Sequence, residues 1–186
     1  VKQVGLEPRE FGQQLALNIK ETGCALPSTE DYVKRWEGPP DSGSLSGSEK
    51  NLAHTYQAVW EQSEFSALEK SHNRACQIHA PEGKVIYGRD QLIELLTGYT
   101  KSFPKGSFRV HHWIVNEEEG KNTRIALRWS FSAEHTGMGS FGKPTGAPVV
   151  IMAITHAEMQ EDLVVREYHA IDEISLWMQI SFYSMS

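Results

Sequence analysis

The sequence predicts an α+β fold, in which helices from the first half of the chain pack on one face of an antiparallel sheet built by the second half. Apolar residues follow helical spacing up to about residue 103, whereas long β-rich segments succeed one another from residue 108 onward. Helices followed by a run of strands are typical of α+β domains. The 186 residues have room for one core of ordinary size, with or without an extension.

The first expected helix covers residues 8–22. Pro8 suits a first helical turn, and Phe11, Leu15 and Ile19 then recur every four residues. This spacing places the three apolar side chains on one stripe, which we expect to pack against another element.

Residues 38–47 read Gly-Pro-Pro-Asp-Ser-Gly-Ser-Leu-Ser-Gly and are too rich in Gly, Pro and Ser to bury apolar surface. We interpret this segment as a linker or loop and place the domain boundary there. Residues 1–47 are then an N-terminal helical extension with its linker, and residues 48–186 form the main domain.

Two further helices and a short strand are expected after the linker. Residues 49–62 have an apolar helical face, residues 74–80 favour a strand, and Asp90 is a good N-cap for the next helix. The apolar stripes of the two helices are formed by Leu52, Tyr56, Val59 and Trp60, and by Leu92, Leu95, Leu96 and Tyr99. Both helices should cover a sheet.

The second half of the chain predicts four long antiparallel strands, at residues 108–115, 122–133, 147–159 and 163–171. A hairpin that turns near residue 162 places Thr155 opposite His169 on one face of the sheet, and His156 opposite Tyr168 on the other. Both faces are largely apolar. Because the helices cover only one of them, we expect a homodimer through the open face.

Composition excludes several classes of function. The net charge of −6 without a basic stripe argues against a nucleic-acid partner, and no apolar run approaches the roughly 20 residues that cross a bilayer. The two cysteines form no CxxC pair and no secretory leader is visible, so we expect a reduced, cytoplasmic protein. No nucleotide-binding loop or serine-hydrolase elbow is present.

The eight histidines raise the question of a metal site. His111 and His112 are neighbours on an expected strand and therefore point to opposite faces. No other spacing typical of a zinc site is found. We expect no metal and no cofactor.

A series of motifs near the C-terminus resembles a known family. His135-Thr-Gly, Pro144-Thr-Gly, an apolar strand, a polar turn, a second strand, Asp172 and Gln179 follow one another in this order. The series resembles the C-terminal half of the SnoaL-like polyketide cyclases, a branch of the cone-shaped α+β barrels related to nuclear transport factor 2. The resemblance covers about residues 50–180 and implies a curved sheet with the helices on its concave face and a pocket between them.

The resemblance also implies a chemistry, which is a cofactor-free intramolecular aldol closure. In the family an acid on the final strand handles the substrate proton, helped by a histidine on the preceding strand. An ungapped match places this histidine position at Thr155, next to His156, and the acid position at His169. Asp172 matches the aspartate that ends the strand in much of the wider family. The chain therefore departs from the pattern, because a histidine stands where the acid is expected.

An imidazole can still exchange protons near neutral pH, because its ordinary pKa is about 6.5. We therefore expect His169 and Asp172 to be catalytic, assisted by Thr155 or His156. Asp172 has the wrong strand parity to orient His169 unless a bulge turns it inward. Its plainer role is to cap the turn after residue 171.

Six residues are candidates for contacts with the substrate. His135 lines the pocket mouth or simply fixes its turn, Arg128 reaches a ligand carboxylate or faces solvent, and the apolar candidates are pocket wall or ordinary core. Tyr168 stands where many family members have tryptophan. The set consists of His135, Tyr168, Trp113, Trp129, Arg128 and Met152.

The leading hypothesis is a SnoaL-like enzyme that applies acid/base chemistry to an apolar, oxygenated small molecule, by aldol closure or a related isomerase, dehydratase or hydrolase step. The alternative is a non-catalytic domain that binds a hydrophobic ligand or serves in dimerisation. The opening Gln3-Val-Gly-Leu resembles the tail that often closes a SnoaL-like domain. Residues 1–47 are accordingly the end of a preceding tandem domain, a segment that follows a removed leader, or an extension docked on the single domain.

Overall fold

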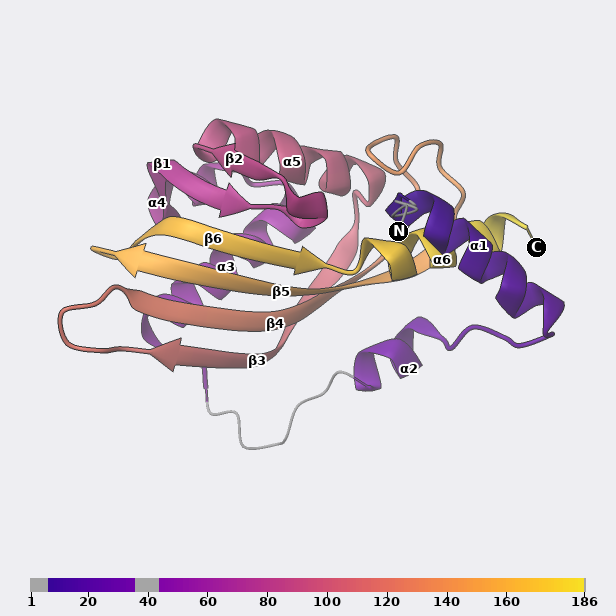
Figure 1. The fold of residues 1–186 in the computed structure, drawn as a ribbon, viewed down its shortest axis with the longest axis horizontal. Helices are drawn as coiled ribbons and strands as arrows, with labels where there is room; N and C mark the ends of the chain where they lie inside the picture. The colour runs from indigo at the N-terminus through magenta and orange to yellow at the C-terminus, as the bar shows by residue number, and fades with distance from the viewer. Residues whose placement is uncertain (1–6, 36–43, 186) are drawn as a thin grey trace, which may run out of the picture.

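The computed structural model describes residues 7–35 and 44–185. Helices and strands are arranged as the sequence predicts, with helices mostly before strands (Figure 1). The helices are α1 (Pro8–Glu21), α2 (Thr29–Lys34), α3 (Gly47–Gln62), α4 (Ser66–Ser71), α5 (Arg89–Ser102) and α6 (Glu173–Ser184), with a short 3₁₀ turn, η1 (Pro81–Gly83). The strands are β1 (His72–His79), β2 (Val85–Tyr87), β3 (Gly106–Asn116), β4 (Thr123–Glu134), β5 (Pro148–Gln160) and β6 (Leu163–Ile171).

The strands form one sheet in the order β2-β1-β6-β5-β4-β3, and this sheet does not close into a complete barrel. Neighbouring strands are antiparallel except β1 and β6, which run parallel. The α+β prediction is thus confirmed, but the sheet is mixed rather than wholly antiparallel. No hairpin dictates the direction of β1 relative to β6, because α5 and four strands separate them in the chain.

The core lies between the helices and one face of the sheet. Trp60 on α3 contacts the rings of Trp129 and Phe131 on β4, at centroid distances of 5.1 and 5.2 Å. All three side chains are buried. In Figure 1 α3 passes behind the sheet, so these aromatic contacts fix it against the inner face.

The β5–β6 hairpin has the expected register. Thr155 lies opposite His169 and His156 opposite Tyr168. The turn is made by Glu161 and Asp162, both in the left-handed region with φ of 51° and 62°, as a two-residue hairpin turn requires.

The register of this hairpin shifts between Glu158 and Met159. Because of the shift Val164 is fully buried, whereas Val165, which strict alternation assigns to the inner face, is only half-buried. Val165 is the extra residue of this bulge and therefore does not follow the alternation of Glu167 and His169. The irregularity lies beyond His156, which stays on the outer face.

Helix α1 packs on α6, but not through the predicted stripe (Figure 1). Gly12 and Ala16 are buried, whereas Phe11 and Leu15 are 47% and 37% exposed. A Cβ atom on Gly12 would lie 2.6 Å from Cβ of Trp177, so only glycine permits this helix crossing. The prediction that Phe11 and Leu15 pack inward was wrong, because backbone proximity decides this contact.

Residues 36–43, which include most of the predicted linker, lie outside the described residues. Helix α2, which precedes them, contacts β5. Within the described ranges no helix is long and apolar enough to cross a membrane.

Candidate functional site

A carboxylate, two imidazoles and a phenol meet on the inner face of the sheet. Oε2 of Glu167 lies 2.7 Å from the Tyr56 hydroxyl, 3.1 Å from Nε2 of His72 and 3.2 Å from Nε2 of His169. The side chains of Glu167 and His72 are 0% exposed, and that of His169 is 1% exposed. We call these four residues the Glu167 cluster.

Local structure explains how the cluster assembles. Glu167 and His169 are two residues apart on β6, so both point to the inner face. Tyr56 reaches them from the buried face of α3, and His72 is the first residue of β1, which pairs with β6. The parallel pairing of β1 with β6 thus brings a histidine from the first half of the chain to a carboxylate near the C-terminus.

Two further side chains contact the Nδ1 atoms of the imidazoles, which are the ring nitrogens not bonded to Glu167. Thr155 Oγ1 lies 3.3 Å from Nδ1 of His169 and accepts a hydrogen bond from Trp129 Nε1 at 3.0 Å. Ser71 Oγ lies 2.8 Å from Nδ1 of His72.

These contacts define one consistent direction of hydrogen bonding. Trp129 N–H has no choice but to donate to Thr155, so the Thr155 hydroxyl is free to donate to Nδ1 of His169. His169 then carries its proton on Nε2 and donates to Glu167. With Ser71 donating to Nδ1, His72 follows the same pattern. All donors therefore converge on an ionised Glu167 carboxylate.

The electrostatics agree with an ionised Glu167. Burial by itself raises the pKa of Glu167, but the adjacent His169 and His72 outweigh burial and hold that pKa well below its usual range. Burial, and then the charge of Glu167, raise the pKa of the Tyr56 hydroxyl, so the phenol stays protonated and donates. Burial and Glu167 also raise the pKa of the neighbouring Cys76 thiol to about 11, which keeps it neutral.

The second carboxylate oxygen of Glu167, Oε1, is unpaired among the described residues. Oε1 is buried and has no hydrogen-bond partner among the described residues. A buried carboxylate oxygen normally has one, because leaving it unpaired costs free energy. Oε1 is therefore the atom of the cluster whose capacity to accept a hydrogen bond is unused.

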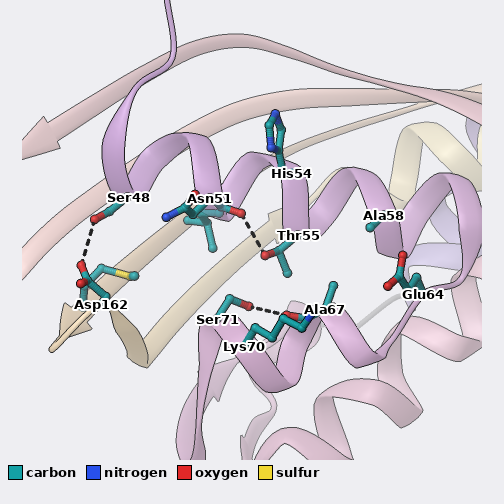
Figure 2. A pocket seen from close by; sticks show the side chains of 12 residues that line it. Ser48, Asn51, His54, Thr55, Ala58, Glu64, Ala67, Lys70, Ser71 and Asp162 are labelled. Carbon is teal, nitrogen blue, oxygen red and sulfur yellow. Dashed lines mark hydrogen bonds between the residues drawn. The ribbon is translucent and has the colours of Figure 1, made fainter.

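A groove of about 410 Å³ between α3 and α4 reaches the edge of the cluster. In Figure 2 Lys70 and Ser71 on α4 lie on the opposite side of this groove from Asn51 and Thr55 on α3, and the Ser71 hydroxyl group is hydrogen-bonded to Ala67. Ser71 is 8% exposed and is the residue that links the groove to His72.

Comparison with known proteins gives this geometry a context. The family model of the SnoaL-like polyketide cyclases matches residues 50–180, which is most of the chain. The chain belongs to this family. Among curated proteins no sequence matches it.

Solved structures with the same fold include three with informative names. A proposed polyketide cyclase from Acidithiobacillus ferrooxidans has a TM-score of 0.63 at 15% identity, covering 74% of this chain and 97% of its own. AclR, a proposed hydroxylase from Streptomyces galilaeus, has a TM-score of 0.58 at 23% identity, covering 71% and 80%. IdmH, a proposed polyketide cyclase from Streptomyces antibioticus, has a TM-score of 0.58 at 14% identity, covering 73% and 99%. At these identities the similarity shows the SnoaL-like fold.

The residues expected to be catalytic in this SnoaL-like chain fall into two groups. His169 and Thr155 lie together on the inner face, within the cluster and its outer contacts. His156 lies on the outer face, where its ring stacks on Tyr168 at 5.7 Å, and Tyr168 also stacks on His79 at 4.3 Å. The structure therefore separates His156 and Tyr168 from His169 by the thickness of the sheet.

Asp172 caps α6. Its Oδ1 accepts a hydrogen bond from the Ser175 backbone N–H at 3.0 Å, and among the described residues no hydrogen bond joins it to His169. Both residues border a depression of about 210 Å³ beside α6, but the His169 ring is engaged with Glu167 and Thr155. The structure gives Asp172 the plainer of its two expected roles.

His135 holds the long loop between β4 and β5. Its backbone N–H donates to Ala147, its carbonyl accepts from Thr145 and Gly146, and its Nδ1 lies 3.1 Å from the Thr145 hydroxyl. The side chain is buried against Phe103, and burial lowers its pKa. These contacts are those of a turn anchor.

The other expected substrate contacts also divide between the two faces. Trp129 and the half-buried Trp113 pack on the inner side, whereas Arg128 and Met152 alternate to the outer side. Arg128 and Met152 therefore lie across the sheet from Glu167.

Tyr56, His72 and Glu167 were not among the expected site residues. Tyr56 was interpreted as part of an apolar helical stripe, and His72 lay just outside the expected strand. A signal did exist for Glu167, which is the carboxylate on an otherwise apolar inner face, two residues before His169. Among the described residues, no group of three or more His, Cys, Asp or Glu side chains is arranged to hold a metal ion.

Proposed function

We propose that the chain is a small-molecule enzyme that applies cofactor-free acid/base chemistry to an apolar, oxygenated substrate, with Glu167 and His169 at its centre. Membership of the SnoaL-like family supports this class of reaction. The observation that carries the proposal is the bare Oε1 of a buried, ionised Glu167 whose other oxygen is fully engaged.

The arrangement suits abstraction of a proton from carbon next to a carbonyl group. Oε1 of Glu167 takes the proton, and the electron pair of the broken C–H bond forms the new bond of an aldol closure or an isomerisation. The proton returns to the substrate oxygen, so no oxidant or reductant is consumed. His169 and Tyr56 hold Oε2 throughout and fix the orientation of the carboxylate.

A panel of carbonyl and epoxide substrates tests the proposal. Glu167→Gln keeps the size of the side chain but removes the base, and we expect turnover to fall at least about a hundredfold. His169→Ala removes the contact that orients the base and should also lower turnover. The matched control is His156→Ala, because it removes a histidine from the neighbouring strand on the outer face and should leave turnover unchanged.

Two results would contradict this mechanism. Turnover unaffected by Glu167→Gln removes the proposed base. No turnover by the wild type, combined with tight binding of the same compounds, favours the alternative of a non-catalytic domain for hydrophobic ligands.

We further propose that the chain forms a homodimer through the outer face of the sheet. Ile114, Ile154 and Tyr168 are 59%, 44% and 38% exposed on β3, β5 and β6. Large apolar side chains exposed on one face of a sheet are typical of a surface that a second copy covers.

A further inference from the structure

A hydrogen-bonded line of side chains leads from the α3/α4 groove to the Glu167 carboxylate. Ser71 borders the groove, its Oγ lies 2.8 Å from Nδ1 of His72, and Nε2 of His72 lies 3.1 Å from Oε2 of Glu167. No other residue that borders the groove has a hydrogen bond to the cluster within the described part of the chain. We infer that Ser71 and His72 are a proton port, through which a hydroxyl group or water in the groove exchanges protons with Glu167.

The transfer conserves protons and converts His72 from its Nε2–H tautomer to its Nδ1–H tautomer. A hydroxyl group in the groove gives a proton to Ser71 Oγ while the Ser71 proton passes to Nδ1 of His72. The proton on Nε2 of His72 passes at the same time to Glu167 Oε2. One proton has then entered the cluster, and the reverse sequence releases it.

Ser71 is able to switch between two acceptors. Its hydroxyl lies 3.2 Å from the Ala67 carbonyl and 2.8 Å from Nδ1 of His72, so a rotation about one bond opens or closes the line (Figure 2). The groups that face His72 are Glu167 from β6 and the edge of the Tyr56 ring from α3, and both are held in place.

The same geometry opposes a nucleophilic role for Ser71, although a serine, a histidine and a glutamate stand in a row. Ser71 is the last residue of α4, where backbone carbonyls face the hydroxyl group. The partial negative charge of these carbonyls disfavours an oxyanion beside Ser71. Transfer of a proton develops no such charge.

The port deepens the proposed function and rests on it, because a substrate hydroxyl group in the groove can exchange its proton with Glu167 through Ser71 and His72. It also indicates that the groove takes the hydroxyl-bearing or carbonyl-bearing end of the substrate. Ser71, Thr55 and Asn51 offer hydroxyl and amide groups there, beside apolar Leu52 and Met159.

Proton exchange can be measured without a substrate. In protein with isotope-labelled histidine, nuclear magnetic resonance reports the tautomers of His72 and His169 and the rate at which each ring exchanges between its Nε2–H and Nδ1–H tautomers. We expect the Nε2–H tautomer for both rings. Ser71→Ala should slow the exchange at His72 roughly tenfold and leave His169 unchanged, because a positioned group no longer relays the proton.

Two variants control the experiment. Thr55→Ala removes a hydroxyl group from the same groove whose hydrogen bond goes only to the Asn51 carbonyl, so exchange at His72 should stay within about twofold of wild type. Ser71→Thr keeps a hydroxyl group and should retain exchange. If the two tautomers of His72 interconvert too fast in the wild type to be resolved, Ser71→Ala must slow the interconversion enough for its rate to be measured.

Unchanged exchange at His72 in Ser71→Ala overturns the port, as does an equal slowing in Thr55→Ala. These outcomes are independent of the turnover assays on Glu167→Gln. The port and the proposed function therefore fail separately.

Discussion

Substitution Glu167→Ala tests whether the carboxylate organises the cluster. The change removes the acceptor shared by Tyr56, His72 and His169 and leaves their donors in a buried site. Tyr56 retains one alternative, because its hydroxyl group lies 3.3 Å from Nε2 of His169. Nε2 of His169 can accept this hydrogen bond only if the ring carries its proton on Nδ1 instead.

The size of the stability loss in Glu167→Ala follows from the number of hydrogen-bond donors left unpaired. Each buried donor without a partner costs about 1 to 3 kcal/mol, so we expect a loss of about 2 to 6 kcal/mol in the free energy of unfolding. This range counts two unpaired donors, because Tyr56 can pair with His169. A loss of this size consumes much of the stability of an ordinary domain, which is about 5 to 15 kcal/mol.

Urea unfolding followed by the fluorescence of the buried Trp60 and Trp129 measures this loss. Tyr56→Phe gives a smaller graded step of about 1 kcal/mol, because it removes one donor together with its bond. Glu158→Ala is the control, because it removes a carboxylate from an exposed pair with Arg166 and should cost under about 1 kcal/mol. A Glu167→Ala loss no larger than that of Glu158→Ala would refute the reasoning.

Two further predictions concern acidity and assembly. The folded-state pKa of Glu167 lies below the ordinary value of 4.5, so its stabilisation is fully present above pH 4.5 and is lost as pH falls toward the folded-state pKa. Relative to Glu167→Gln, the wild type should therefore lose about 1.4 kcal/mol of unfolding free energy per pH unit below that value, and parallel pH profiles would contradict the shift. For assembly, light scattering should give twice the monomer mass for the wild type and the monomer mass for Ile154→Lys with Ile114→Lys. A monomeric wild type at high concentration rejects the dimer.

The hairpin that carries His169 could be predicted because its signals are local. The expected turn near residue 162 placed Thr155 opposite His169, and the structure has this pair because one extra residue on β6, Val165, offsets the two-residue turn at Glu161 and Asp162. The bulge at Val165 interrupts the alternation of inward and outward side chains along β6. It could not be predicted, because no sequence pattern indicates it.

The partners of Glu167 could not be predicted in the same way, because they are distant along the chain. Tyr56 and His72 lie 111 and 95 residues before Glu167. A tyrosine on an apolar helical stripe has the same pattern whether it merely packs or donates a hydrogen bond. The position of α1 was mispredicted for a related reason, since Gly12 and Ala16 offer close approach rather than apolar area.

The arrangement around Glu167 is poorly suited to stability alone. Three donors crowd one carboxylate oxygen while the other oxygen has no partner, so the buried charge is held but not fully compensated. An apolar residue of similar volume at position 167, together with phenylalanine at position 56, would fill this site without burying a charge. The cluster instead keeps an ionised base in a fixed orientation, with one oxygen free and one hydrogen-bonded line to the groove. A fixed, ionised carboxylate with one unpaired oxygen suits acceptance of a proton, and the two imidazoles that lower its pKa make it a weaker base than a free carboxylate.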